Sequence, residues 1–128
     1  MKHLKRLYIA LIFLAISISL CIFEQYTINS TYKEANEYIN TAIEQLDKND
    51  YKAAKAACKQ LNDYWGEKQR YMTAMIDHGS LDEASVTIGN LEDLADSESD
   101  DLESELITAK NQIKSIYENQ KITFGNVF

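Results

Sequence analysis

The strongest pattern in the sequence is an apolar run near its N-terminal end. Seventeen consecutive uncharged and mostly apolar residues, Leu7–Phe23, follow Lys2, Lys5 and Arg6 and precede Glu24. As a helix this run would be roughly 26 Å long, slightly less than the roughly 30 Å hydrocarbon core of a bilayer. The long stems of Lys5 and Arg6 can make up the difference. The pattern therefore predicts a transmembrane helix over residues 7–23.

A cleaved signal peptide is the alternative interpretation of this run. Ser17 and Ser19 are small residues at the spacing that a signal peptidase requires. The apolar run continues past Ser19 to Phe23, however, and no helix breaker precedes the cleavage site. We therefore favour a retained signal anchor. A lipoprotein signal would need a small residue before Cys21, where the sequence has Leu20.

The charges beside the run predict its orientation. Basic residues next to a transmembrane helix usually remain in the cytoplasm. The basic tail, residues 1–6, is therefore expected in the cytoplasm, and residues 24–128 are expected across the membrane. Within the second part we predict one extracytoplasmic helical domain over residues 24–121 and a C-terminal tail over residues 122–128.

Beyond the anchor, apolar residues repeat at steps of three and four, which is typical of amphipathic helices. The first such stretch can continue directly from the membrane helix. The chain has no proline and only four glycines, which favours long helices over a turn-rich β fold. The four apolar stripes are Tyr32, Ala35, Ile39, Ala42 and Leu46; Tyr51, Ala54, Cys58, Leu61, Trp65, Met72 and Met75; Leu81, Ala84, Ile88, Leu91 and Ala95; and Leu102, Leu106, Ala109, Ile113 and Ile116.

Polar residues mark the expected ends of these helices. Asn49 or Asp50 should cap the second amphipathic helix, which is expected to end near His78–Gly79. Ser80 and Glu83 have the spacing of a capping box at the head of the third helix. The polar segment 97–101 is expected to turn the chain into the fourth helix.

The pattern leaves the packing of the helices open. Two helical hairpins can form a four-helix bundle or a short solenoid of tetratricopeptide type. One unbroken helix over Leu81–Glu118 is a further alternative, because several apolar residues there keep a seven-residue spacing. Glu98 and Glu105 would then be charged residues on its inner face, which weakens that alternative. The predicted fold is all-α: an N-terminal transmembrane helix followed by about four amphipathic helices as two helical hairpins.

Charge is distributed unevenly along the chain. The net charge is −7, and the first six residues carry +3, so the rest carries −10. The segment Asp77–Glu105 holds eleven acidic residues and no lysine or arginine, whereas Glu24–Ile76 is close to neutral at −1. An acidic surface repels nucleic acid and anionic lipid. We therefore expect no nucleic-acid partner.

The sequence has no recognisable set of catalytic residues. It lacks a glycine-rich phosphate loop and a serine elbow, and it has too few histidines for a triad or a zinc hydrolase. The weak candidates for a metal site are Asp77, His78, Asp82 and Glu83, but a single helix rarely directs such neighbours at one ion. The simpler interpretation places His78 at the C-terminal end of a helix, where the helix dipole favours a cation. We expect no enzymatic activity, no cofactor and no metal.

Two groups of side chains are candidates for binding a partner. Aromatic residues cluster within two turns of the second amphipathic helix, where core packing is the default and Tyr64 and Tyr71 could face a partner. Acidic residues near the end of the third helix could face a basic surface. The aromatic group is Tyr64, Trp65 and Tyr71, and the acidic group is Glu92, Asp93 and Asp96.

Together, several of these segments resemble a known family. Asp50–Tyr51, Leu61 with Trp65, the segment 76–82 and the closing segment 124–128 are similar to a small membrane-anchored family of spore-forming Firmicutes, the domain of unknown function 4363. The resemblance covers essentially the whole chain. It implies a single-pass membrane protein with an extracytoplasmic helical domain, often found alongside a multi-pass membrane protein, and it transfers no catalytic residue.

The leading hypothesis is a non-enzymatic interaction or accessory subunit of a membrane protein complex. Its expected contacts are the lipid bilayer, through residues 7–23, and an integral membrane protein, with a homo-oligomer as a further option. Two alternatives stay open. One is a sensory helical module that acts through a partner chain, and the other is a secreted helical protein after signal peptide cleavage.

Overall fold

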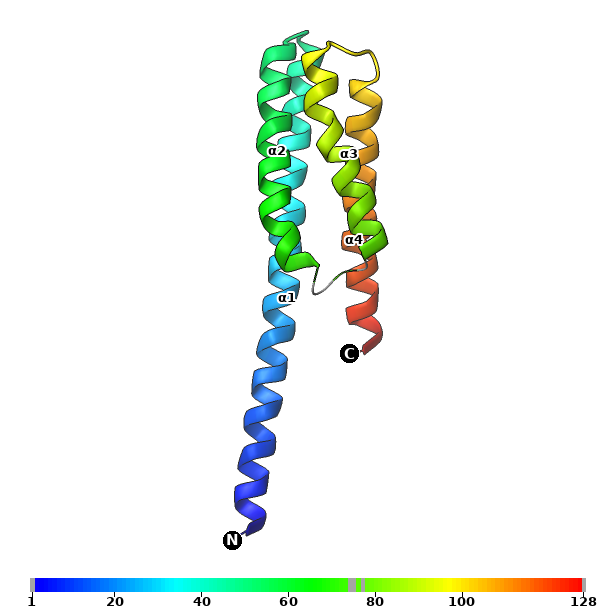
Figure 1. Ribbon diagram of the computed structural model, residues 1–128. Helices are drawn as coiled ribbons and strands as arrows, with labels where there is room; N and C mark the ends of the chain where they lie inside the picture. The colour runs from blue at the N-terminus through cyan, green and yellow to red at the C-terminus, as the bar shows by residue number, and fades with distance from the viewer. Residues whose placement is uncertain (1, 74–75, 77, 128) are drawn as a thin grey trace.

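The computed structural model describes residues 2–73, 76 and 78–127, and the side chains of these residues up to Asn119. Four helices make up this part of the chain (Figure 1): α1 (Lys2–Asp47), α2 (Tyr51–Met72), α3 (His78–Asp96) and α4 (Leu102–Val127). None of the described residues lies in a strand. The prediction of an all-α fold is confirmed.

The helices form a closed bundle. Helix α1 contacts both α2 and α4, and α3 also contacts both of them, so each helix has two neighbours (Figure 1). A solenoid would keep the first and last helices apart. The four-helix bundle is therefore the correct alternative, and the unbroken helix over Leu81–Glu118 is wrong, because α3 and α4 are separate helices that pack against each other.

Helix α1 belongs to two environments. It runs for 46 residues without interruption and contains neither glycine nor proline. Its first buried residue is Ile28, so the half before that residue projects from the bundle (Figure 1). An 18-residue window of this helix has a mean hydropathy of 2.4, and none of the window is buried by the rest of the chain. The projecting half fits the predicted transmembrane helix.

The core consists of the predicted apolar stripes. Most of their residues are buried, and Tyr32, Leu46 and Tyr51 pack partly buried against them; Met75 lies outside the described residues. The core also contains residues that the stripes omit, among them Thr31 and Thr87. Their hydroxyls donate to backbone carbonyls four residues earlier, at 2.8 and 3.1 Å. These buried hydroxyls are thus satisfied within their own helices.

The α2–α3 connection differs from the sequence-based expectation. Helix α2 ends at Met72, not near His78–Gly79, and α3 already begins at His78. Ser80 therefore lies inside the first turn of α3, and the predicted Ser80–Glu83 capping box is wrong. The first turn of a helix has no intrahelical partners for its amides, so glycine and histidine are tolerated there and do not have to end a helix.

Two other helix ends can be compared with the sequence. Asp50 is confirmed as the cap of α2, because its carboxylate accepts a hydrogen bond from the Ala53 amide at 3.1 Å. Helix α4 continues to Val127, through most of the segment 122–128 that was expected to be a tail. With no proline in the chain, nothing in that segment removes a backbone donor from the helix.

The α1–α2 and α3–α4 turns share one geometry at the end of the bundle away from the projecting helix. Each contains one residue in the left-handed region, Asn49 at φ 59° and Glu98 at φ 52°. Each closes the preceding helix with the two backbone hydrogen bonds of a Schellman motif. These bonds run from Asp50 N to Gln45 O (2.9 Å), Asn49 N to Leu46 O (2.9 Å), Ser99 N to Leu94 O (2.9 Å) and Glu98 N to Ala95 O (3.1 Å).

Replacing Glu98 with glycine should stabilise the protein. A residue with a side chain costs about 1–2 kcal/mol in the left-handed region, and glycine would remove this cost. Part of the resulting gain in stability is lost because glycine gives the unfolded chain more conformational freedom. We expect Glu98→Gly to raise the free energy of unfolding by about 0.5–1 kcal/mol, measured by urea denaturation of the full chain in mild detergent. The control is Lys59→Gly at an exposed site within α2, which should lower it by about 1 kcal/mol. Destabilisation by both changes would contradict the assigned strain at Glu98.

Candidate functional site

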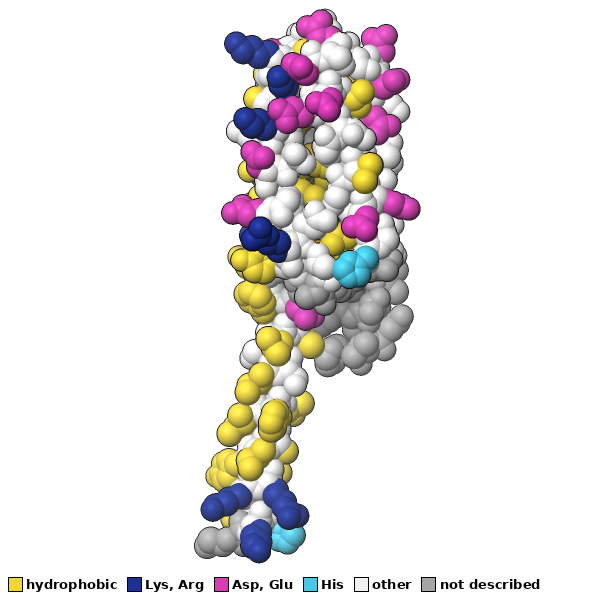
Figure 2. Space-filling view, in the orientation of Figure 1, with side chains coloured by type: hydrophobic (Ala, Val, Ile, Leu, Met, Phe, Trp, Pro, Cys, Tyr) yellow, Lys and Arg dark blue, Asp and Glu magenta, His cyan; other side chains and the backbone are white. Residues whose placement is uncertain are grey.

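The candidate partner-binding side chains lie in two separate regions of the bundle. The acidic group is on the last turns of α3, at the end away from the projecting half of α1, where acidic side chains are conspicuous (Figure 2). The aromatic group is on the second half of α2, nearer to the projecting helix. The structure therefore does not unite the two predicted groups into one site.

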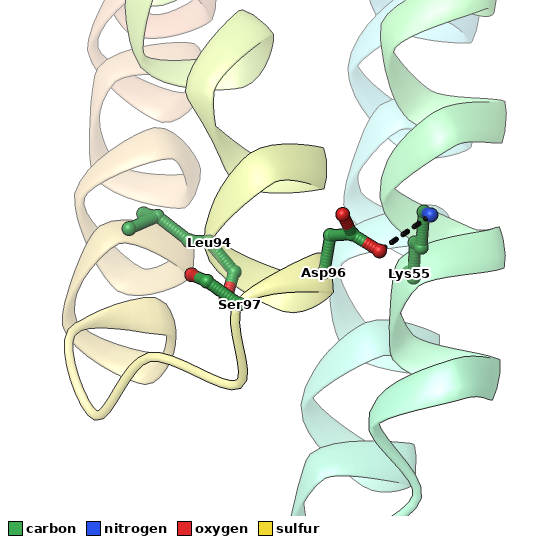
Figure 3. A network of polar contacts seen from close by, with 4 residues as sticks. All are labelled: Lys55, Leu94, Asp96 and Ser97. Carbon is green, nitrogen blue, oxygen red and sulfur yellow. Dashed lines mark hydrogen bonds and ion pairs between the residues drawn. The ribbon is translucent and has the colours of Figure 1, made fainter.

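The three acidic candidates have different surroundings. Asp96 pairs with Lys55 of α2 across the helix interface, with 2.8 Å between Oδ1 and Nζ (Figure 3). The hydrogen bond and the charge of Asp96 raise the pKa of Lys55. Both side chains are partly exposed to solvent, at 40% for Lys55 and 67% for Asp96, so this pair contributes little to stability. Glu92 is half-buried and Asp93 is exposed, which leaves Asp93 the more accessible carboxylate.

Asp93 also lines an open groove of about 490 Å³ between the end of α3 and the start of α4. The groove contains three carboxylates and no lysine or arginine. A surface of this kind attracts a cationic group and repels an anionic one. Its lining residues are Asn90, Asp93, Leu94, Ser97, Asp101, Ser104 and Glu105.

Trp65 belongs to the core and not to a partner surface. Its side chain is only 2% exposed, and its indole Nε1–H donates to Ser85 Oγ of α3 at 2.9 Å. The Ser85 hydroxyl in turn donates to the Leu81 carbonyl at 2.8 Å. The prediction that Trp65 contacts a partner is therefore wrong, because its ring is buried in the core and its indole N–H is already hydrogen-bonded within the bundle.

The two tyrosines of the aromatic group differ in exposure. Tyr64 is half-buried; its ring packs against Tyr38 of α1 with centroids 5.6 Å apart, and Lys68 Nζ lies 5.8 Å from its ring centroid. Partial burial raises the pKa of Tyr64 to about 12. Tyr71 is 64% exposed. Of the three aromatic candidates, Tyr71 therefore offers the most surface to another molecule.

The predicted metal candidates do not form a site among the described residues. His78 and Asp82 are exposed in the first turns of α3, and Asp77 lies outside the described residues. No group of three or more His, Cys, Asp or Glu side chains in the described part of the chain is arranged to hold a metal ion. The interpretation of His78 at a helix C-terminus is wrong, because it begins α3, where the dipole disfavours a cation.

The family model of the domain of unknown function (DUF4363) matches residues 22–127. The chain belongs to this family. The match begins at the end of the apolar run and continues through α4, so it covers the whole bundle. No curated protein and no solved structure matches the chain. The resemblance to this family is thus confirmed, and it supplies no functional residue.

The cysteines of this DUF4363 chain are not a reactive pair. Cys58 is buried in the bundle and Cys21 lies on the projecting half of α1; both are free thiols. Burial, and secondarily the charge of Glu92, raises the pKa of Cys58 to about 11. A thiol that stays protonated near neutral pH is a poor nucleophile and a poor metal ligand. Cys58 therefore serves as a small core residue.

Replacing Ser85 with alanine should destabilise the bundle, because the buried Trp65 Nε1–H would lose its acceptor. An unsatisfied buried donor costs about 1–3 kcal/mol. Urea unfolding of the full chain in detergent, followed by Trp65 fluorescence, would measure the loss. Ser115→Ala, at an exposed position of α4, is the matched control and should have almost no effect. Equal unfolding midpoints for the two variants would show that the hydrogen bond is not a stabilising contact.

The raised pKa of Cys58 predicts a loss of stability at alkaline pH. From pH 9 to pH 11 the unfolded thiol has lost its proton while the folded thiol retains it. The free energy of unfolding should therefore fall by up to about 1.4 kcal/mol per pH unit in that range. The free energy of unfolding of Cys58→Ala should fall less steeply with pH. Tyr64→Phe provides the comparison for the tyrosine, because partial burial raises the pKa of Tyr64 to about 12. If the free energies of unfolding of wild type and Cys58→Ala change in parallel with pH, the raised pKa of Cys58 would be contradicted.

Proposed function

We propose that the chain is a non-enzymatic, membrane-anchored helical protein that serves as an accessory or interaction subunit of a membrane protein complex. In this proposal residues 7–23 are retained in the bilayer, the basic tail is cytoplasmic and the bundle is extracytoplasmic. The observation that carries the proposal is the continuity of α1, which joins a free apolar segment to the bundle with no intervening break. Such a chain holds a folded surface at a fixed height above the membrane.

The small space enclosed between the helices favours a protein that docks a partner on its surface over one that senses a ligand bound in its interior. The space enclosed near Trp65 and Met72 measures only about 10 Å³, which is barely the volume of one water molecule. A small-molecule sensor that binds its ligand between these helices would need a larger cavity. The outer surface is therefore the better candidate for recognition. If the bundle is a sensor, it responds to a partner chain and not to a ligand bound between its helices.

The acidic groove is the surface that we assign to the partner. Asp93 of α3 and Asp101, just before α4, both line this groove. Opposite charge between partners accelerates their encounter and selects between them. An extracytoplasmic region of an integral membrane protein that carries lysine or arginine and extends well above the membrane is the partner with the matching chemistry.

Charge reversal should test this assignment. Full-length protein would be crosslinked mildly in intact cells, recovered by an affinity tag and examined by mass spectrometry. Asp93→Lys combined with Asp101→Lys should reduce recovery of the partner several-fold, because both residues line the groove and it would gain positive charge. Asp96 is left unchanged, since it pairs with Lys55. The matched control is Asp82→Lys, an exposed site at the opposite end of α3.

The same experiment separates the alternatives. A full-length chain in the membrane fraction, with a mass of 14.7 kDa plus the tag, would support the retained anchor, whereas a shorter chain in the medium would support a secreted protein. Recovery of the chain alone would favour a homo-oligomer. Unchanged partner recovery with the double variant would rule out the acidic groove as the contact.

A further inference from the structure

The position of α1 determines where the lower end of the bundle lies, if residues 7–23 span the membrane as proposed above. Only four residues separate Phe23, the last of the apolar run, from Ile28, the first buried residue. At 1.5 Å per residue they cover roughly 6–7 Å along the helix. The headgroup layer on each side of a bilayer is about 5–8 Å thick. The bundle therefore begins within the headgroup layer.

The helix between these two residues provides no hinge. Sharp kinks in helices arise at proline, at glycine or serine pairs, or at inserted residues, and α1 has neither proline nor glycine. The bundle therefore cannot fold away from the lipid by bending at the junction. Side chains at its lower end must face headgroups or the outermost part of the acyl chains.

Helix α4 reaches the same level. The rings of Tyr32 and Tyr117 stack with centroids 4.6 Å apart, which aligns these two positions of the antiparallel helices α1 and α4. Phe23 lies nine residues below Tyr32, and Val127 lies ten residues beyond Tyr117, which correspond to about 14 and 15 Å. The C-terminal end of α4 thus points toward the projecting half of α1 (Figure 1) and ends near the level of Phe23.

An open groove of about 580 Å³ lies between α1 and the end of α2 at this level. Its lower part is apolar and comes from α1, whereas its upper part has hydroxyl groups and the Lys68 ammonium. Among the described residues Lys68 forms no ion pair; it lies beside the ring of Tyr64. The lining residues are Leu20, Phe23, Glu24, Tyr26, Thr27, Ser30, Thr31, Lys68 and Tyr71.

We propose that this groove binds one phospholipid of the adjacent leaflet. The phosphate lies at the Lys68 ammonium, within reach of the hydroxyls of Thr27 and Ser30, and an acyl chain follows Leu20 and Phe23. Lysine and tyrosine are residue types that favour the interface between headgroups and acyl chains, and Tyr26 of α1 and Tyr71 of α2 both line the groove.

Two features of the groove favour a phospholipid as the bound molecule. Leu20 and Phe23 are 58% and 64% exposed and belong to the apolar run itself, so the groove is continuous with the surface that faces the acyl chains. Its one lysine matches the negative charge of a phosphate. Glu24 also lines the groove and opposes an anion, which favours phospholipids whose headgroup carries a compensating amine, such as phosphatidylethanolamine.

Photo-crosslinking from Tyr71 tests the proposal. Full-length protein carrying Tyr71→p-benzoylphenylalanine would be reconstituted into vesicles of phosphatidylethanolamine and phosphatidylglycerol, irradiated and examined by mass spectrometry. The control is the same replacement at Tyr51, at the opposite end of α2 and about 30 Å away along the helix. We expect a phospholipid adduct at position 71 and none at position 51.

Lys68→Gln provides the second measurement. With the photoreactive group at position 71, it should reduce the lipid adduct several-fold, whereas Lys59→Gln, at an exposed site higher on α2, should leave the adduct unchanged. A chain that floats with vesicles but gives no lipid adduct at position 71, or only an adduct to polypeptide, overturns the lipid site and leaves the anchor intact. A chain that does not float with vesicles overturns both proposals.

Discussion

The uninterrupted course of α1 is the constraint on which the rest of the structure depends. A helix satisfies its backbone hydrogen bonds internally, so it can pass from lipid to protein without losing any of them. In this chain the side chains of α1 begin to be buried at Ile28, while the helical backbone continues unchanged. The projecting apolar segment and one wall of the bundle therefore belong to a single continuous helix, and the other helices pack against its bundle half.

Closure of the bundle follows from how the other helices pack on α1. Each of the four helices contributes alanines to the core, including Ala35, Ala54, Ala84 and Ala109, all with no exposed surface. Small residues at these positions allow close approach, and larger neighbours such as Ile39 and Leu106 fill the space between layers. The stacked pair Tyr32–Tyr117 joins the last helix to the first. A shift of α1 would therefore disturb both of its interfaces at once.

The sequence predicted those features that depend on local periodicity and failed for those that depend on which helices become neighbours. The stripes were correct because a period of 3.6 residues needs no knowledge of partners, and Asp50 was identified because capping is local. Helix α3 begins three residues before the start that a Ser80 cap predicts, which also reverses the predicted dipole environment of His78. The pairing of Trp65 with Ser85, and the groove between α1 and α2, could not be predicted, because the residues involved lie on different helices.

The distribution of charge along the bundle suits a molecule that has different contacts at its two ends. Eight of the eleven acidic residues in the segment 77–105 lie between Glu92 and Glu105, around the turn farthest from the projecting helix. Helix α3 has 19 residues, so this turn is about 28 Å from its lower end. That distance exceeds three Debye lengths at physiological ionic strength, each about 8 Å. In the proposed membrane-anchored arrangement, anionic headgroups would therefore exert little force on the acidic turn, and its charge could act on a partner without pushing the bundle away from the lipid.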